Sequence, residues 1–223
     1  MKTRTTGAWI ALFMLPSVAI FLAFYLMPIG TVLVTSFTRW DGFNAPVFVG
    51  LDNYLKLFRS SKFSESLWNL LGWSLIAATV HVGFGTLVAF LLNRKPAGWQ
   101  LTRTVFMIPN VISVAAWAMI YKYFFRNDIG ILNSFLRVFN PGVDINWFAQ
   151  SPYAFWAITL TWVFYAVVVT LLVMSDLMAI PDTLSEAAMI DGARPWQKVR
   201  YIDLPLCRNA IGTGVVLSIT ARI

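Results

Sequence analysis

The sequence predicts an all-α, polytopic membrane protein, and three observations support this fold class. Hydrophobic residues make up 58% of the chain and charged residues only 12%, with a mean hydropathy of +0.69, whereas soluble domains carry about 25% charged residues. Four intervals contain no Asp, Glu, Lys or Arg: residues 5–38, 66–93, 104–121 and 145–175. Each is close to or longer than the roughly 20 residues that a spanning helix needs. A fifth apolar run begins at Asn209 and reaches the last residue, so we expect four full spans and a short fifth.

We expect the spans at about residues 8–37, 67–92, 104–124, 153–174 and 207–223. The first run follows two basic residues, as in a signal peptide, but no small-residue cleavage pattern closes it. An uncleaved first span is therefore expected. Its two prolines, Pro16 and Pro28, are tolerated in a membrane helix where neighbours or local unwinding satisfy the backbone. In the second span, Gly72, Gly83 and Gly85 predict close approach of another helix.

Two polar segments between the spans are each expected to hold a surface helix with one apolar stripe. The stripe residues are Leu51, Tyr54, Leu55 and Phe58 in the segment 38–65, and Ile131, Leu132, Phe135, Leu136 and Phe139 in the segment 126–152. Asn140-Pro141-Gly142 should end the second helix.

Basic residues in short loops indicate which side of the membrane is cytoplasmic. They flank the first span, crowd the loop between spans two and three, and recur after span four: Lys2, Arg4, Arg94, Lys95, Arg103, Arg194, Lys198, Arg200 and Arg208. These positions share one side if the spans alternate. The N-terminus and the polar segment 181–205 are therefore expected in the cytoplasm.

The segment 181–205 is the longest polar interruption in the C-terminal half, and its pattern predicts a helical hairpin. Thr183 and Glu186 fit a capping box at the start of a helix over residues 184–191. Gly192 supplies a left-handed stop, and Pro195 suits the first turn of a second helix. Pro205 is expected to end the pattern.

A helix of eight residues is too short to be stable alone in water, because its nucleus is costly. Something must pack against it, and Ala187, Ala188 and Ile190 are expected to form a smooth surface for that contact. On the residues alone, two alternatives stay open: the hairpin packs on the protein's own spans, with Glu186 merely a cap, or it docks on a separate partner.

The same segment carries a known signature. Glu186, Ala187, Ala188, Gly192, Ile202, Leu204 and Pro205 match, without a gap, the cytoplasmic loop of permease subunits in binding-protein-dependent ABC importers. Residues 48–54, 91–94 and 127–133 are similar to the carbohydrate-importer branch. The chain thus resembles, over nearly its whole length, the permeases of the maltose, lactose and glycerol-3-phosphate type, without their extra N-terminal spans.

The resemblance implies one transmembrane domain over residues 1–223, a helical bundle with five of an expected six spans present, in the inner (plasma) membrane of a prokaryote. It implies that residues 181–205 are the coupling segment that docks on an ABC ATPase dimer. The docking residues would be the seven signature residues above, with Glu186 facing a basic residue of the ATPase. A second, related permease and an extracytoplasmic solute-binding protein are the other implied partners, and the solute would be a sugar or a sugar-like molecule.

Polar and aromatic residues in spans three and four could line a sugar path, because sugar sites combine aromatic faces with hydrogen-bonding side chains. The candidates are Asn110, Ser113, Trp117, Thr159, Trp162 and Tyr165. The alternative is that they pack helices together or form an interfacial aromatic belt. His81, an ionisable residue inside span two, could serve the path or bond to a neighbouring helix.

Several kinds of site are not expected. The chain has no phosphate-binding Gly-x4-Gly-Lys-Ser/Thr loop, so ATP should be bound by the partner ATPase and no cofactor by this chain. We find no nucleophile–base pair and no metal-ligand spacing, which argues against an enzyme. The net charge of +7 indicates topology and not nucleic-acid binding, because no basic stripe with interleaved aromatic residues is present. The single cysteine, Cys207, excludes an intrachain disulfide.

Alternatives remain open at this point. An ABC permease for another solute, such as amino acids, polyamines or phosphate, would share the signature. A secondary transporter or channel would carry an inverted repeat and intramembrane charges, of which the sequence offers only His81. The family continues beyond residue 223, and Arg222 would fall inside the membrane. We therefore expect a truncated or frame-shifted copy that does not transport alone, and a non-transporting membrane anchor or remnant is the third alternative.

Overall fold

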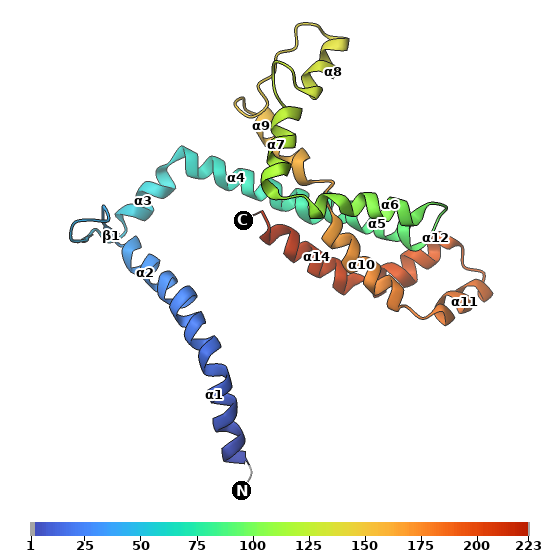
Figure 1. The fold of residues 1–223 in the computed structure, drawn as a ribbon, viewed down its shortest axis with the longest axis horizontal. Helices are drawn as coiled ribbons and strands as arrows, with labels where there is room; N and C mark the ends of the chain where they lie inside the picture. The colour runs from blue at the N-terminus through green and yellow to red at the C-terminus, as the bar shows by residue number, and fades with distance from the viewer. Residues whose placement is uncertain (1–2, 223) are drawn as a thin grey trace. The chain divides into compact units, whose positions relative to one another are not determined.

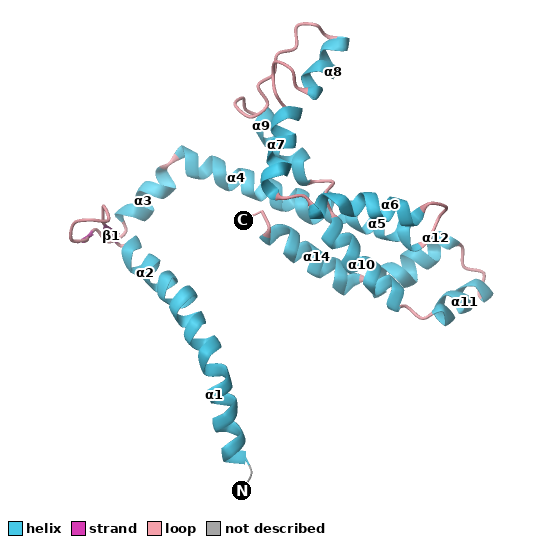
Figure 2. Ribbon diagram, viewed as in Figure 1, coloured by secondary structure: helices cyan, strands magenta, loops and turns pink. Residues whose placement is uncertain are grey.

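The computed structural model describes residues 3–222 and forms two compact units, whose boundary falls between Leu67 and Trp68. Helices make up nearly all of its regular structure, and one short β-hairpin is the exception within the described residues (Figure 2). The all-α fold class is confirmed. We describe the two units separately.

The first unit begins with a long apolar helix. It consists of α1 (Thr3–Phe21), a π-helical turn η1 (Leu22–Leu26) and α2 (Met27–Ser36), and its stretch Trp9–Ser36 is long and apolar enough to cross a membrane. The π-turn lies directly before Pro28, which has no N–H to donate to the carbonyl four residues earlier. The helix widens there rather than breaking, and the N–H of Met27 bonds to the carbonyl of Leu22.

A small hairpin and a short helix follow. Strand β1 (Thr38–Arg39) pairs antiparallel with β2 (Val47–Phe48), and α3 (Asp52–Arg59) comes next. The side-chain amide of Asn53 donates to the carbonyls of Ser36 and Thr38 at 2.9 and 2.8 Å. Asn53 thus fixes the end of the long helix against α3, which is the first of the two helices expected between spans.

A continuous helix of 33 residues, Ser61–Asn93, is the second that could span a membrane by length and composition. It comprises α4 (Ser61–Ile76), the π-helical turn η2 (Ala77–His81) and α5 (Val82–Asn93). The π-turn lies at the middle of this helix.

Three bent pairs of helices complete the second unit. Helix α6 (Trp99–Met107) with the 3-10 turn η3 (Ile108–Val111) meets α7 (Val114–Phe124) at 100°. Helix α9 (Tyr153–Trp162) meets α10 (Val167–Ala179) at 41°. The segment α12 (Pro195–Lys198), η4 (Val199–Asp203) and α13 (Leu204–Leu206) meets α14 (Arg208–Thr220) at 65°. If each pair crosses the membrane as one span, the described residues hold five spans, the number expected from the sequence.

The core of the second unit lies where α5, α10 and α14 pack side by side (Figure 1). Its buried residues are Val82, Ala89, Leu92, Val169, Val173, Met174, Leu177, Cys207 and Ala210. At Gly85 the contact is closest: a Cβ atom there would lie 2.9 Å from the side chain of Val169. The hydroxyl of Thr170 also donates to the carbonyl of Gly85 at 3.0 Å. Gly85 therefore permits close approach, as predicted.

The other two glycines of this helix differ. A Cβ atom at Gly72 would lie 3.1 Å from the ring of Phe155, so this position too faces a neighbouring helix closely. At Gly83 no atom lies within 4 Å of the Cβ position. The prediction was wrong for Gly83. Positions 83 and 85 of a helix point in different directions, and Gly83 is exposed, whereas Gly85 is buried.

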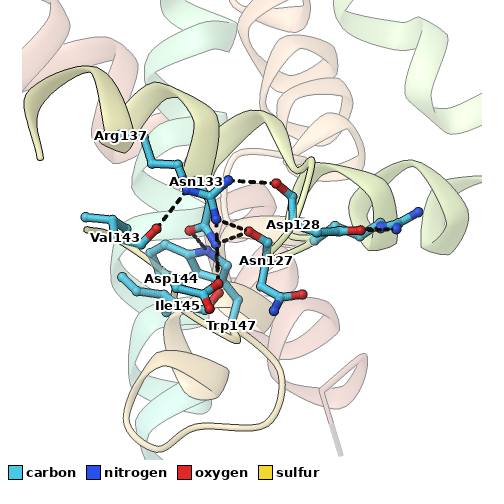
Figure 3. Close-up of polar contacts among 9 residues, drawn as sticks. Asn127, Asp128, Asn133, Arg137, Val143, Asp144, Ile145 and Trp147 are labelled. Carbon is cyan, nitrogen blue, oxygen red and sulfur yellow. Dashed lines mark hydrogen bonds and ion pairs between the residues drawn. The ribbon is translucent and has the colours of Figure 1, made fainter. Parts of the chain in front are cut away.

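Between α7 and α9 the chain forms a tightly bonded loop around α8 (Ile131–Phe139). Asn133 is fully buried, and its amide donates to the carbonyls of Asn127 and Ile145 at 3.1 and 2.9 Å. Its oxygen accepts from the indole N–H of Trp147 at 2.7 Å, as Figure 3 shows. One side chain thus ties together three parts of the loop.

Arg137 adds a second set of bonds to the same loop (Figure 3). Its guanidinium donates to the carbonyls of Val143, Asp128 and Asn127 at 2.8, 2.7 and 2.6 Å. The neighbouring carboxyl of Asp128 pairs with the side chain of Arg126, and this pairing lowers the pKa of Asp128 to about 2.

Helix α8 matches the second expected surface helix, and it ends before Asn140 as predicted. The exposed apolar stripe differs from the prediction. Ile131, Phe135 and Phe139 are exposed, but Leu132 and Leu136 are half-buried, on the same side as Asn133. The bonds of Asn133 decide which side of α8 faces inward.

Candidate functional site

The polar segment after α10 forms a hairpin that begins with α11 (Asp182–Ile190). Pro181 occupies the cap position, and no side chain caps the helix there. The capping box predicted from Thr183 and Glu186 was therefore wrong, because the helix begins two residues earlier than expected. Thr183 lies inside the first turn, where Asp182 supplies a negative charge that the helix dipole favours.

The end of α11 is a Schellman motif at Gly192. The N–H of Ala193 bonds to the carbonyl of Ala188 at 2.9 Å, and the N–H of Gly192 bonds to that of Met189 at 3.1 Å. Gly192 has a φ of 75°, in the left-handed region that glycine adopts without a Cβ clash. The predicted glycine stop is confirmed.

The second half of the hairpin begins at Pro195, as predicted. The N–H of Arg194 donates to the side chain of Gln197 at 2.7 Å and so satisfies one donor at the helix start. Pro205 does not end the pattern as expected: it lies inside α13, and the helix turns only at Cys207. The π-turn η4 precedes Pro205 as η1 precedes Pro28, so the missing proline donor again widens the helix.

An ion pair with a buried carboxylate lies within this second half of the hairpin. Asp203 is buried, and its carboxylate lies 3.8 Å from the ammonium group of Lys198. Trp196 and Tyr201 of the same segment are exposed, with their ring centres 6.2 Å apart.

The seven signature residues differ in where their side chains lie. Glu186, Ala187, Gly192, Leu204 and Pro205 are exposed, Ile202 is half-buried, and Ala188 is only 8% exposed. Ala188 packs inward, so it sets the distance between α11 and the rest of the hairpin and does not itself present a surface.

On α11 the sequence predicted that Ile190 faces a partner, and it missed Met189 beside it. Met189 is 64% and Ile190 is 86% exposed. Only Ser185 and Ala188 of this helix are turned toward the chain. A nine-residue helix gains most of its stability from packing, so an apolar helix left this open calls for another surface. The signal for Met189 was that neither the signature nor the expected packing surface gave this apolar residue a role.

A second group of candidate residues surrounds the breaks in the bent pairs. Where α9 ends, the carbonyls of Thr161 and Val163 lose their helical donors. The indole N–H of Trp117 donates to the carbonyl of Thr161 at 3.0 Å, and Nδ1 of His81 donates to that of Val163 at 3.0 Å. Both donors come from other spans, as an interrupted membrane helix requires. His81 thus bonds to a neighbouring helix, which is one of the two roles expected for it.

Tyr165 links the bent pair α9–α10 to the bent pair α6–α7. Its hydroxyl donates to the side-chain oxygen of Asn110 at 2.6 Å, and its ring lies 5.5 Å from that of Trp117. Trp117 and Tyr165 border a cavity of about 350 Å³ between α6–α7 and α9–α10. The lining residues are Val105, Phe106, Pro109, Trp117, Tyr121, Leu160, Thr161, Phe164 and Tyr165.

Of the six path candidates, the structure thus brings Asn110, Trp117 and Tyr165 together, and Trp162 borders an adjoining cavity of about 270 Å³. The other two lie elsewhere. Ser113 caps α7 by accepting from the N–H of Ala116 at 3.3 Å. Thr159 is buried and accepts from the indole of Trp73 at 3.0 Å, so it packs helices together.

Metal binding has no support in the part of the chain that the structure describes, where no three His, Cys, Asp or Glu side chains gather. The two candidate sites are therefore an exposed helical hairpin and an uncharged, aromatic cavity at the helix breaks.

Comparisons with known proteins agree with this arrangement. Residues 81–223 match the family described as "Binding-protein-dependent transport system inner membrane component". The probable ABC transporter permease protein YesP of Bacillus subtilis (strain 168) is 33% identical over 92% of this chain and 67% of its own length. The trehalose/maltose transport system permease protein MalF of Thermococcus litoralis is 30% identical over 92% of this chain and 70% of its own length.

Solved structures share the fold. A chain in the crystal structure of a bacterial alginate ABC transporter, in complex with an alginate pentasaccharide-bound periplasmic protein, is similar with a TM-score of 0.80 and 22% identity. The match covers 96% of this chain and 72% of that one. This chain belongs to the family of inner-membrane permease components of binding-protein-dependent transport systems.

Proposed function

We propose that this chain is the permease subunit of an ATP-driven importer for a sugar or oligosaccharide, and that its hairpin 181–205 docks on the ATPase. The observation that carries the docking is the open apolar face of α11 at Met189 and Ile190, held out by the Schellman motif at Gly192. Exposed apolar surface of this kind marks an interaction site.

The solute class rests on the relatives and on the cavity. MalF of T. litoralis is named for trehalose and maltose transport. The cavity between the bent pairs joins aromatic rings with the hydroxyl groups of Tyr121, Thr161 and Tyr165, which suits a sugar ring. In this proposal the chain forms half of the path with a second permease and receives solute from an extracytoplasmic binding protein. The ATPase partner binds and hydrolyses ATP, and this chain holds no cofactor.

The docking is tested by co-expressing the chain with its ATPase and purifying the complex. Ile190→Asp places a charge on the most exposed apolar side chain of α11. We expect the co-purified ATPase and the solute uptake to fall about fivefold or more, since removing one interface anchor costs 1 kcal/mol or more. Glu186→Ala should lower both as well.

The matched control is Glu65→Ala, an exposed glutamate outside the hairpin, which should change neither quantity. Thermal unfolding of each variant shows whether it is folded. Full co-purification and uptake by folded Ile190→Asp and Glu186→Ala would refute docking through this face.

A further inference from the structure

Arg222 places a positive charge beside the cavities described above. It follows α14, which packs against α10, α5 and η2, the turn at the middle of the Ser61–Asn93 helix. Its guanidinium carbon lies 4.1 Å from the centre of the Trp162 ring, a cation–π contact. Trp162 is 8% exposed, and His81 lies against it with ring centres 5.8 Å apart. The cation is therefore held at mid-span by aromatic packing.

This cation has no anionic partner among the described residues. Its Nε atom is buried and has no hydrogen-bond acceptor, and no Asp or Glu lies within ion-pair distance of it. A charge inside a membrane protein is costly and normally finds a partner. His81 cannot be that partner, because it is either neutral or positive and its Nδ1 already donates to Val163. The guanidinium thus has a donor, Nε, that no described residue of this chain accepts.

Those donors border the smaller cavity, of about 270 Å³. Arg222 and Trp162 line it together with Trp117, Thr161 and Tyr165, and no Asp or Glu is among its lining residues. Trp117, Thr161 and Tyr165 also line the larger cavity of about 350 Å³, so the two spaces adjoin. One aromatic path therefore has a cation at one end, uncharged polar side chains where the two cavities meet, and mostly apolar side chains at the other end.

We infer that this paired cavity selects sugars that carry an anionic group, with Arg222 binding a carboxylate. Arginine presents a planar fork of donors that matches a carboxylate, and a fork stacked on Trp162 is held in one plane. The rings of Trp117 and Tyr165 would pack on the sugar faces. This inference rests on the proposed function and names its substrate class: uronic acids or oligosaccharides that contain them.

The test measures binding to the full-length chain in nanodiscs of zwitterionic lipid. Intrinsic tryptophan fluorescence is followed while a digalacturonate or its neutral counterpart, a digalactoside, is added. We expect the acidic disaccharide to bind about tenfold more tightly or better than the neutral one, as for a charged hydrogen-bonded pair. Arg222→Gln should remove this preference, and Arg222→Lys should keep part of it, because lysine retains the charge but not the fork.

Arg208→Gln, at the other end of the same helix and exposed, is the matched control and should keep the preference. Equal binding of both disaccharides, or an acidic preference that survives in Arg222→Gln, would overturn the inference. A lipid phosphate is the other source of such an anion. If added phosphatidylglycerol abolishes the acidic preference in the wild-type chain, Arg222 serves a lipid headgroup and the inference fails. Neutral sugar binding with intact ATPase co-purification would overturn the inference and leave the proposed function standing.

Discussion

At the scale of single residues, backbone groups without helical partners explain most of the specific contacts. The breaks in the spans release the carbonyls of Thr161 and Val163, and Trp117 and His81 donate to them. In the loops between the spans, Asn53 and Asn133 each bridge two carbonyls. Leaving such groups unpaired would cost about 1–3 kcal/mol each. These polar groups therefore each have a structural role, and for His81 this is one of the two roles expected from the sequence.

The closest packing in the core gives a prediction at this scale. Gly85→Ala would place its Cβ atom 2.9 Å from the side chain of Val169, and such overpacking costs about 1–3 kcal/mol. Gly83→Ala, two positions earlier in the same helix, meets nothing within 4 Å and gains the helix propensity of alanine. Thermal unfolding in detergent should show a lower Tm for Gly85→Ala and an equal or higher one for Gly83→Ala.

A second substitution checks the cause. Val169→Ala removes the Cγ1 atom of Val169, which lies 2.9 Å from the new methyl group, while the Cβ atoms of Val169 and Ala166, at 2.9 and 3.0 Å, stay in place. The pair Gly85→Ala and Val169→Ala should therefore be somewhat less destabilised than the sum of the two single changes. Strict additivity would show that the Cγ1 atom of Val169 is not the obstacle.

At the scale of elements, the sequence predicted where helices occur better than how they begin, bend and end. The glycine stop at Gly192 followed from local chemistry, because only the backbone of one residue decides it. The capping box failed because Pro181 was available as an earlier start. The 100° bend after Val111 depends on partners in other spans that no local pattern reveals. The same holds for the cavity and for the inward turn of Ala188, since both depend on tertiary packing.

The loop around α8 gives a prediction at the element scale. Asn133→Ala removes two donated bonds and the acceptor of the Trp147 indole. The groups left unpaired should destabilise the loop by more than about 2 kcal/mol. Hydrogen exchange should accelerate over residues 126–152 and stay unchanged over α10. Asn127→Ala is the control, because only the backbone carbonyl of Asn127 takes part in these bonds, and its exchange should match the unsubstituted chain. Unchanged exchange in Asn133→Ala would mean that Arg137 alone holds the loop.

At the scale of the whole molecule, the charge pattern makes a prediction about sidedness. The loop between α5 and α6 carries Arg94 and Lys95, and basic short loops stay in the cytoplasm. Cys207 is fully buried, so it should react little with added reagents. We expect an impermeant maleimide to label Gln150→Cys in intact spheroplasts, and to label Ala97→Cys only after permeabilisation; both positions are exposed. The reverse pattern would show that the membrane orientation, and with it the cytoplasmic place of the hairpin, was wrongly assigned.

The open face of α11 also has a consequence for the cell that makes this protein. Ile190 is 86% exposed as long as no other subunit covers it. A copy that has not met its ATPase therefore resembles a damaged protein, because exposed apolar side chains on a marginal helix are what chaperones and proteases recognise. Surplus copies should be short-lived, and the supply of ATPase would then set how many permeases survive in the membrane. The face of α11 that docks on the ATPase would then also match the amount of permease to the amount of ATPase.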